Sequence, residues 1–212
     1  MTTKDKILDT AERLFARHGV EGTSLRAITK EAGVNLAAVN YHFQSKEALI
    51  HAVIARRVDP INEKRNALLD TVDPTGEGPL PIEAVLHAFL GPMFEAAGAG
   101  EFAPMIGRLF TESPALSEQV FRKHLAQVAE RFFRAFHRAL PELPIVELMW
   151  RMHFMLGAVT HTMSGSRTLH LLSNGLCDPK DIEGTTRRLM TFLLGGFQSP
   201  AAVAEEVHLA TH

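Results

Sequence analysis

The sequence predicts an all-α protein in which an N-terminal three-helix unit precedes a larger helical body. Apolar residues recur three and four positions apart along nearly the whole chain of 212 residues, which is the period of one helix face. No run shows the sustained alternation and β-branched enrichment that are typical of strands. Hydrophobic residues make up 46% of the chain, enough to bury a sizeable core.

Three apolar stripes precede residue 45, and residues that start or stop helices bound each of them. Ser, Thr and Asn side chains accept from the free N–H groups of a helix start, and glycine adopts the positive φ that often follows a helix end. The sequence therefore predicts helices over about 7–18, 24–32 and 35–43. The expected starts and stops, in chain order, are Gly19, Thr23 or Ser24, Gly33 and Asn35.

A longer fourth helix, about 46–72, is expected after Ser45, and its Asp59-Pro60 pair predicts a kink because proline lacks an N–H donor. The turn-rich segment 73–79 is the clearest linker. We therefore predict a helix-turn-helix domain over 1–50 and a ligand-binding and dimerisation domain over 80–212. The expected body helices are roughly 81–98, 102–112, 114–139, 144–173 and 179–197, with a short helix after Ser199-Pro200.

Charge is distributed unevenly along the chain. Residues 1–57 hold nine Lys and Arg against six Asp and Glu, which leaves 13 of the 22 basic and 18 of the 24 acidic residues for the remainder. A basic head on an acidic body is expected if only the head meets a polyanion. An architectural DNA-binding protein, which is usually basic throughout, is disfavoured by the same asymmetry.

The sequence disfavours several other classes of protein. No nucleophile–base pair, phosphate-binding glycine loop, HxxxH motif or Cys/His cluster stands at recognisable spacing, so we expect no enzyme, no cofactor and no metal site. The lone Cys177 excludes an intrachain disulfide. The N-terminus lacks a secretion signal and no apolar run is long enough to cross a bilayer, so we expect a cytoplasmic protein without a membrane partner.

The 23–43 segment has the layout of a helix-turn-helix whose second helix exposes small and polar side chains. Small alanines allow close approach to the major groove, and Asn40 can pair with an adenine edge. An ordinary helical hairpin with a polar surface is the alternative that this layout leaves open. The predicted DNA-contacting residues are Thr23, Ser24, Arg26, Asn35, Leu36, Ala37, Asn40, Tyr41, His42 and Lys46.

Four motifs resemble the DNA-binding domain of the TetR family of regulators: Ala11-Glu-x-Leu-Phe15, Thr23-Ser-x-Arg-x-Ile28, Ala32-Gly-Val34 and Tyr41-His-Phe-x-Ser-Lys-Glu-x-Leu49. The resemblance implies a homodimer that inserts two recognition helices into successive major grooves of a palindromic operator, usually as a repressor. It also implies backbone contacts from Thr23 and Arg26, base contacts from Leu36, Ala37 and Asn40, and phosphate contacts from Tyr41, His42 and Lys46.

Within that family, the chain is similar to the fatty-acid-responsive, PsrA-type branch. The similarity rests on Arg56-Arg-x-Asp-Pro60 after the recognition segment, and on Phe89-Leu-x-Pro-Met93, Ala139-Leu-Pro-x-Leu-Pro144 and Trp150-Arg-Met-His-Phe-Met-Leu-Gly157. It implies release from double-stranded operator DNA by a small hydrophobic effector, such as a fatty acid or acyl thioester. A multidrug- or aromatic-compound-responsive repressor of an efflux or catabolic operon is the alternative.

Phenylalanine and methionine recur on the apolar stripes of the body, and a cavity lined by them suits an acyl chain. Solid packed core is the alternative interpretation of each stripe. Arg151 or His153 could meet a carboxylate head, and a surface or interface role is the alternative for Arg151. The predicted effector pocket consists of Phe89, Met93, Phe94, Met105, Leu109, Phe110, Leu125, Val128, Arg151, Met152, Met155 and Val159.

The last two long helices are expected to pair with those of a second copy. Their glycines would allow close helix approach, and a dimer is needed because one recognition helix supplies too few contacts for specific binding. We expect the effector to move the fourth helix and so change the spacing of the two recognition helices. The glycines in question are Gly157, Gly165, Gly195 and Gly196.

Overall fold

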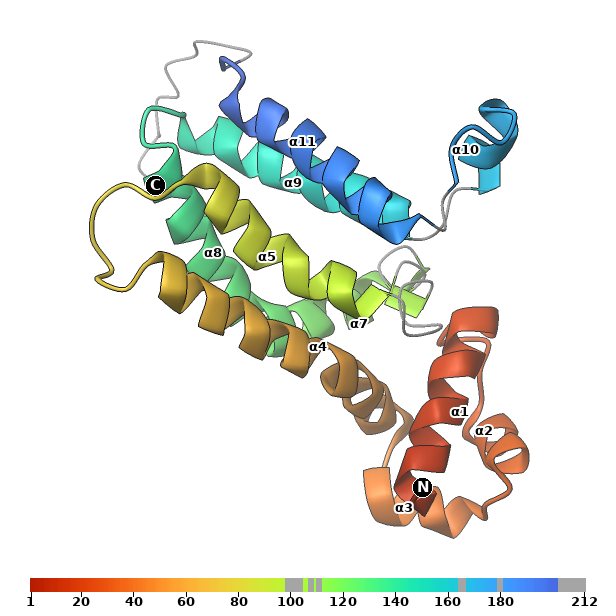
Figure 1. The fold of residues 1–212 in the computed structure, drawn as a ribbon. Helices are drawn as coiled ribbons and strands as arrows, with labels where there is room; N and C mark the ends of the chain where they lie inside the picture. Colours follow the sequence, from red (N-terminus) through yellow and green to blue (C-terminus); the bar gives the residue numbers. More distant parts are fainter. Residues whose placement is uncertain (98–104, 107–108, 110–111, 164–166, 179–180, 202–212) are drawn as a thin grey trace.

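The computed structural model describes residues 1–97, 105–106, 109, 112–163, 167–178 and 181–201. Every regular element among these residues is helical, which confirms the predicted all-α class (Figure 1). No helix in these ranges is both long and apolar enough to cross a membrane. The elements are α1 Thr3–His18, α2 Leu25–Ala32, α3 Leu36–Phe43, α4 Lys46–Val72, α5 Ile82–Ala97, α7 Pro114–Val120, the π-helical turn η1 Phe121–Leu125, α8 Ala126–Ala139, α9 Ile145–Met163, α10 Arg167–Leu172 and α11 Ile182–Gln198.

Helices α1–α3 form a small unit, which we call the head, at one end of the long α4 (Figure 1). A capping box opens α1, since the Thr2 hydroxyl accepts from the Asp5 N–H and the Asp5 carboxylate accepts from the Thr2 N–H. Ser24 and Asn35 cap α2 and α3 as predicted. Gly33 ends α2 with φ 67°, a left-handed conformation that suits glycine.

Helices α5, α8, α9 and α11 form a body with the end of α4, which runs without interruption from the head into it (Figure 1). The body core gathers buried side chains of α4, α5, α8, α9 and α11. Phe132 and Phe136 lie at its centre with no exposed surface; the Phe132 ring centroid is 5.0 Å from that of Phe89, and the Phe136 ring stacks on Phe197 at 5.2 Å. Pro60 lies inside α4, so the predicted kink position does not end the helix.

A second core lies in the head, and it extends beyond the first four helices. Met105, Leu109 and Val120 are buried in the same cluster as Ile7, Phe15 and the other apolar residues of α1–α4. The segment before η1 therefore packs with the head, whereas α8 after it packs with the body. The division of the chain at its linker does not predict this grouping.

Two long predicted helices are interrupted. The predicted 114–139 helix contains the π-helical turn η1, and the predicted 144–173 helix is divided into α9 and α10. Most of the predicted 102–112 helix and the short helix after Pro200 lie outside the described residues.

Candidate nucleic-acid interface

The caps at the starts of α2 and α3 fix how α3 is presented. Ser24 Oγ accepts from the Ala27 N–H at 3.1 Å, and Asn35 Oδ1 accepts from the Ala38 N–H at 2.8 Å. Val39, in the middle of α3, is fully buried against the head core. The helix is therefore anchored along one edge, and its opposite face is free.

That free face carries most of the predicted DNA-contacting side chains. Leu36 is 41% exposed and Tyr41 is 83% exposed, although both are large apolar or aromatic residues. The Tyr41 and His42 rings lie edge to face, with their centroids 5.1 Å apart. The other exposed members of the predicted set are Ser24, Arg26, Asn35, Ala37, Asn40 and His42, and Lys46 is half-buried.

Thr23 lies apart from this set. Its side chain is buried, and its hydroxyl donates to the carbonyls of Gly19 at 2.8 Å and Leu14 at 3.2 Å. This hydroxyl ties the turn after α1 to the start of α2, so we leave Thr23 out of the proposed DNA-contacting set. Ser24 alone makes the α2 cap that the sequence assigned to either residue.

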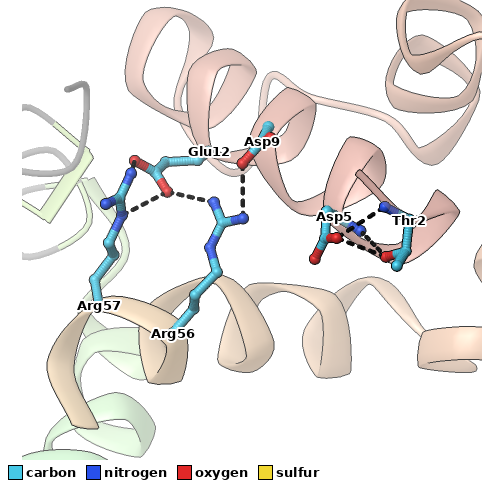
Figure 2. A network of polar contacts seen from close by, with 6 residues as sticks. All are labelled: Thr2, Asp5, Asp9, Glu12, Arg56 and Arg57. Atoms are coloured by element: carbon cyan, nitrogen blue, oxygen red, sulfur yellow. Dashed lines mark hydrogen bonds and ion pairs between the residues drawn. The ribbon is translucent and has the colours of Figure 1, made fainter. Parts of the chain in front are cut away.

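A network of ion pairs joins α1 to α4, and we call it the Glu12 clamp (Figure 2). Glu12 is only 5% exposed and accepts from Arg56 at 2.8 Å and from Arg57 at 2.8 and 3.0 Å. Arg56 also donates to Asp9 at 2.7 Å. This clamp was not predicted, and its one signal in the sequence is an acid, Glu12, on the apolar face of α1 between Leu8 and Phe15.

A histidine pair joins α4 to η1. Nδ1 of His51 lies 3.1 Å from Nε2 of His124, and His124 Nδ1 lies 3.7 Å from Asp59 Oδ1. Asn62 on α4 also donates to the His124 carbonyl at 2.8 Å. Burial lowers the pKa of His51 below its ordinary value of 6.5, and the positive charge of Lys123 and the neighbouring His124 lower it further.

This lowered pKa predicts a pH-dependent stability. Between the folded-state pKa of His51 and about pH 6.5, the unfolded chain binds a proton at this residue that the folded chain does not bind, so the free energy of unfolding rises with pH in that window. Urea unfolding at pH 5.5 and 7.5 measures this rise, and we expect it to be smaller in His51→Gln. An equal pH dependence in wild type and variant would contradict the prediction.

The structure distributes the predicted effector residues over two cores. Those that belong to the body core are Phe89, Met93, Phe94, Val128, Met152, Met155 and Val159. Those that pack with the head core are Met105, Leu109 and Leu125, whereas Phe110 lies outside the described residues. The two groups do not form one lining, and effector contact by any of them stays a prediction.

Arg151 has a structural role that the sequence did not predict. Its guanidinium bonds Glu147 and donates to the carbonyls of Gly196, Phe197, Ser199 and Pro200 at 2.8–3.0 Å. These bonds use the donors that a ligand carboxylate would need, and they fasten α9 to the end of α11. His153 is exposed beside Trp150 rather than turned into the body.

Arg65 is a buried cation in the body that was not among the predicted site residues. Its guanidinium donates to the Phe89 carbonyl at 2.7 Å and to Asn62 at 3.2 Å, and it lies 4.3 Å from the centroid of the Phe89 ring. Burial without a carboxylate partner among the described residues lowers the pKa of Arg65 to about 10. The sequence carries one signal of this burial. Arg65 stands seven residues after Val58 and four before Leu69, on a buried stripe of α4.

Two pockets open on α5. One, of about 260 Å³, lies between α4 and α5 beside the Glu12 clamp, and we call it the junction pocket. The other, of about 180 Å³, lies between α5 and α11 and contains Phe94 of the predicted effector set. The junction pocket is lined by Arg56, Arg57, Pro60, Ile61, Lys64, Pro92, Glu95 and Ala96.

Comparison with known proteins identifies both parts of the chain. Residues 7–53 match the family described as bacterial regulatory proteins, tetR family, and residues 87–196 match the tetracyclin repressor-like C-terminal domain. The chain belongs to the TetR family. The head and the helical body of this TetR-family protein therefore correspond to the N-terminal and C-terminal domains of the family.

Relatives of this TetR-family chain agree with that assignment. The transcriptional regulator SrpR of Pseudomonas putida is 26% identical over 68% of this chain and 64% of its own. Among solved structures, PfmR of Thermus thermophilus shares its fold, with 19% identity, a TM-score of 0.60 and coverage of 91% of this chain and 99% of that one. The fatty acid degradation regulator FadR of Bacillus halodurans also shares it, with 18% identity, a TM-score of 0.58 and coverage of 94% of this chain and 98% of that one. The stretches that match three curated relatives cover only 27%, 64% and 59% of those relatives' own lengths.

The TetR-family body exposes an apolar face on its last long helices. On α9, Met149, Trp150 and Phe154 are each more than half exposed, and the Trp150 and Phe154 rings stack with centroids 5.6 Å apart. On α11, Phe192 is 70% exposed. A Cβ built at Gly157, Gly195 or Gly196 meets nothing within 4 Å, so these predicted contact glycines leave open space within the protomer.

Proposed function

We propose that this protein is a homodimeric repressor that binds a palindromic operator through α3. The observation that carries the proposal is the free face of α3, which is held outward by two capped helix starts in a TetR-family head. Asn40 would read an adenine edge, with Leu36 and Ala37 beside it in the major groove. The side chains proposed to hold phosphates or the adjoining backbone are Ser24, Arg26, Asn35, Tyr41, His42 and Lys46.

The dimer would form through the apolar face of α9 and α11. Exposed aromatic side chains are characteristic of interface cores, and exposed glycines let helices from two copies approach closely. Two-fold pairing would place two α3 helices about one DNA turn apart, roughly 34–36 Å, as successive major grooves require.

We propose a small hydrophobic effector, with a fatty acid or acyl thioester as the first class to test. The Phe- and Met-rich body core and the PsrA-type sequence pattern support this class. The fold shared with the fatty acid degradation regulator FadR agrees with it in kind. Binding that moves α4, which belongs to both cores, would change the α3 spacing, so effector and operator would each lower the affinity of the other by the same factor.

The experiment that tests this function is selection of bound sequences from random duplex DNA by the purified protein. A palindromic consensus with half-sites one helical turn apart would support the proposal. Binding without sequence preference would contradict it. Titration of the selected duplex with long-chain fatty acids, acyl thioesters and aromatic cations then separates the proposed effector from the multidrug-type alternative.

Asn40→Ala is expected to weaken binding to the selected operator by about 1–3 kcal/mol and to relax base preference at one position of each half-site. The salt dependence of binding should stay unchanged because Asn40 carries no charge. Lys46→Ala is the matched contrast: it should weaken binding to all sequences and lower the salt slope by about one. Fluorescence anisotropy at several salt concentrations measures both; equal effects of Asn40→Ala on operator and random DNA would contradict the base contact.

A further inference from the structure

The junction pocket forms where two helices carry internal prolines. Its wall includes Pro60 of α4 and Pro92 of α5, and each lies inside its helix. A proline inside a helix cannot donate to the carbonyl four residues earlier, and its ring crowds that turn. In α4 the carbonyl that loses its donor is that of Arg56, so the turn affected by Pro60 contains both arginines of the Glu12 clamp.

Positive charge predominates in the wall of this pocket. Its ionisable side chains are those of Arg56, Arg57, Lys64 and Glu95. Lys64 Nζ already lies 3.0 Å from Glu95 Oε2, so no carboxylate of the wall remains for the arginines. Their acids belong to α1, outside the wall, and Arg56 Nε is buried without an acceptor among the described residues.

The rest of the lining is apolar. Ile61 and the two prolines contribute apolar side chains to the wall, and Ala96 adds a small one. A volume of about 260 Å³ is below that of sites for drug-sized molecules, which begin near 300 Å³. A suitable occupant is therefore short, partly apolar and negatively charged at one end.

We propose that the junction pocket binds a small organic anion, a carboxylate on a short apolar chain, with its charge on Arg57 and its chain against Pro60, Ile61 and Pro92. The planar guanidinium presents paired donors that match a carboxylate. Glu12 uses the same Arg57 atoms, so the anion competes with Glu12 and loosens α1 from α4. This site is separate from the body core, where the proposed hydrophobic effector would lie.

Calorimetric titration of the full-length protein with hexanoate, without DNA, tests the site. Hexanamide, which has the same chain and no charge, is the ligand control. Ala96→Leu fills the pocket from α5 without touching the clamp, and Ala67→Leu makes the same change at an exposed α4 position outside the pocket. We expect saturable hexanoate binding that weakens about tenfold or more in Ala96→Leu, with wild-type affinity in Ala67→Leu and at least tenfold weaker hexanamide binding.

Equal hexanoate affinity in wild type and Ala96→Leu, equal affinity for hexanamide, or no saturable binding would each overturn the proposal. Because this titration needs no DNA, its result is independent of the proposed operator binding. The effect of hexanoate on operator binding rests on the proposed function. Hexanoate should lower operator affinity in wild type and in Ala67→Leu but not in Ala96→Leu. Hexanoate binding that leaves operator affinity unchanged would overturn the competition with Glu12.

Discussion

Phe154→Glu is expected to convert the protein to a monomer and to lower its operator affinity by at least about 100-fold. Phe154 is 62% exposed in the single chain and stacks on Trp150, so the substitution leaves the protomer core intact. The proposed dimer would bury one such charge from each copy at an aromatic centre, and each typically costs about 2 kcal/mol or more of dimerisation free energy. Sedimentation velocity measures the oligomeric state, and fluorescence anisotropy with the selected operator measures binding.

Phe121→Glu is the matched control for this prediction. Phe121 is also an exposed aromatic residue, at 44%, but it lies in η1, outside the apolar face of α9 and α11. The control should sediment as the wild type does and keep its operator affinity. A dimeric Phe154→Glu variant with wild-type DNA binding would show that the two copies pair through another surface.

Glu12→Ala is expected to cost about 2–3 kcal/mol of unfolding free energy. Removal of one partner of a buried ion pair typically costs about 3–5 kcal/mol, and the smaller figure follows because Arg56 and Arg57 stay about a quarter to a third exposed. The melting temperature should fall by roughly 4–12 °C for a chain of this size. Hydrogen exchange should rise in α1, which loses its hold on α4.

Glu130→Ala is the control for the Glu12 variant. Glu130 pairs with Arg134 one helical turn away on α8, and both side chains are about two-thirds exposed. Such surface pairs contribute about 0.3–0.5 kcal/mol, so the control should melt close to wild type. If the two variants lose the same stability, the clamp contributes no more than an ordinary surface pair.

Local features of the fold could be predicted from the sequence, and non-local ones could not. The caps at Ser24 and Asn35 and the turn at Gly33 depend on neighbours within four residues, and each was predicted. The exposed face of α3 follows from the same helical spacing. The Glu12 clamp instead joins residues 44 and 45 positions apart, and spacing within one helix carries no information about such a pair.

The roles of two arginines could not be predicted for the same reason, because their partners are distant in the sequence. Arg151 was predicted to meet a ligand, but its donors bond carbonyls 45–49 residues away that only the folded chain brings near. Arg65 was overlooked because a charged residue in a long helix is usually solvated. Its place on a buried stripe was visible, yet the carbonyl and ring that accept it come from α5.

The π-helical turn η1 has a consequence for how this chain can vary. A π turn accommodates one residue more than the α-helix around it, and each added residue rotates a helix by about 100°. Val120 before η1 points into the head core, and Val128 and Phe132 after it point into the body core. Deletion of a single residue between 121 and 125 would restore a regular helix but turn one of these sets away from its core. Insertions and deletions should therefore be tolerated far less in this stretch than in the 73–79 linker, even though much of its own surface is exposed.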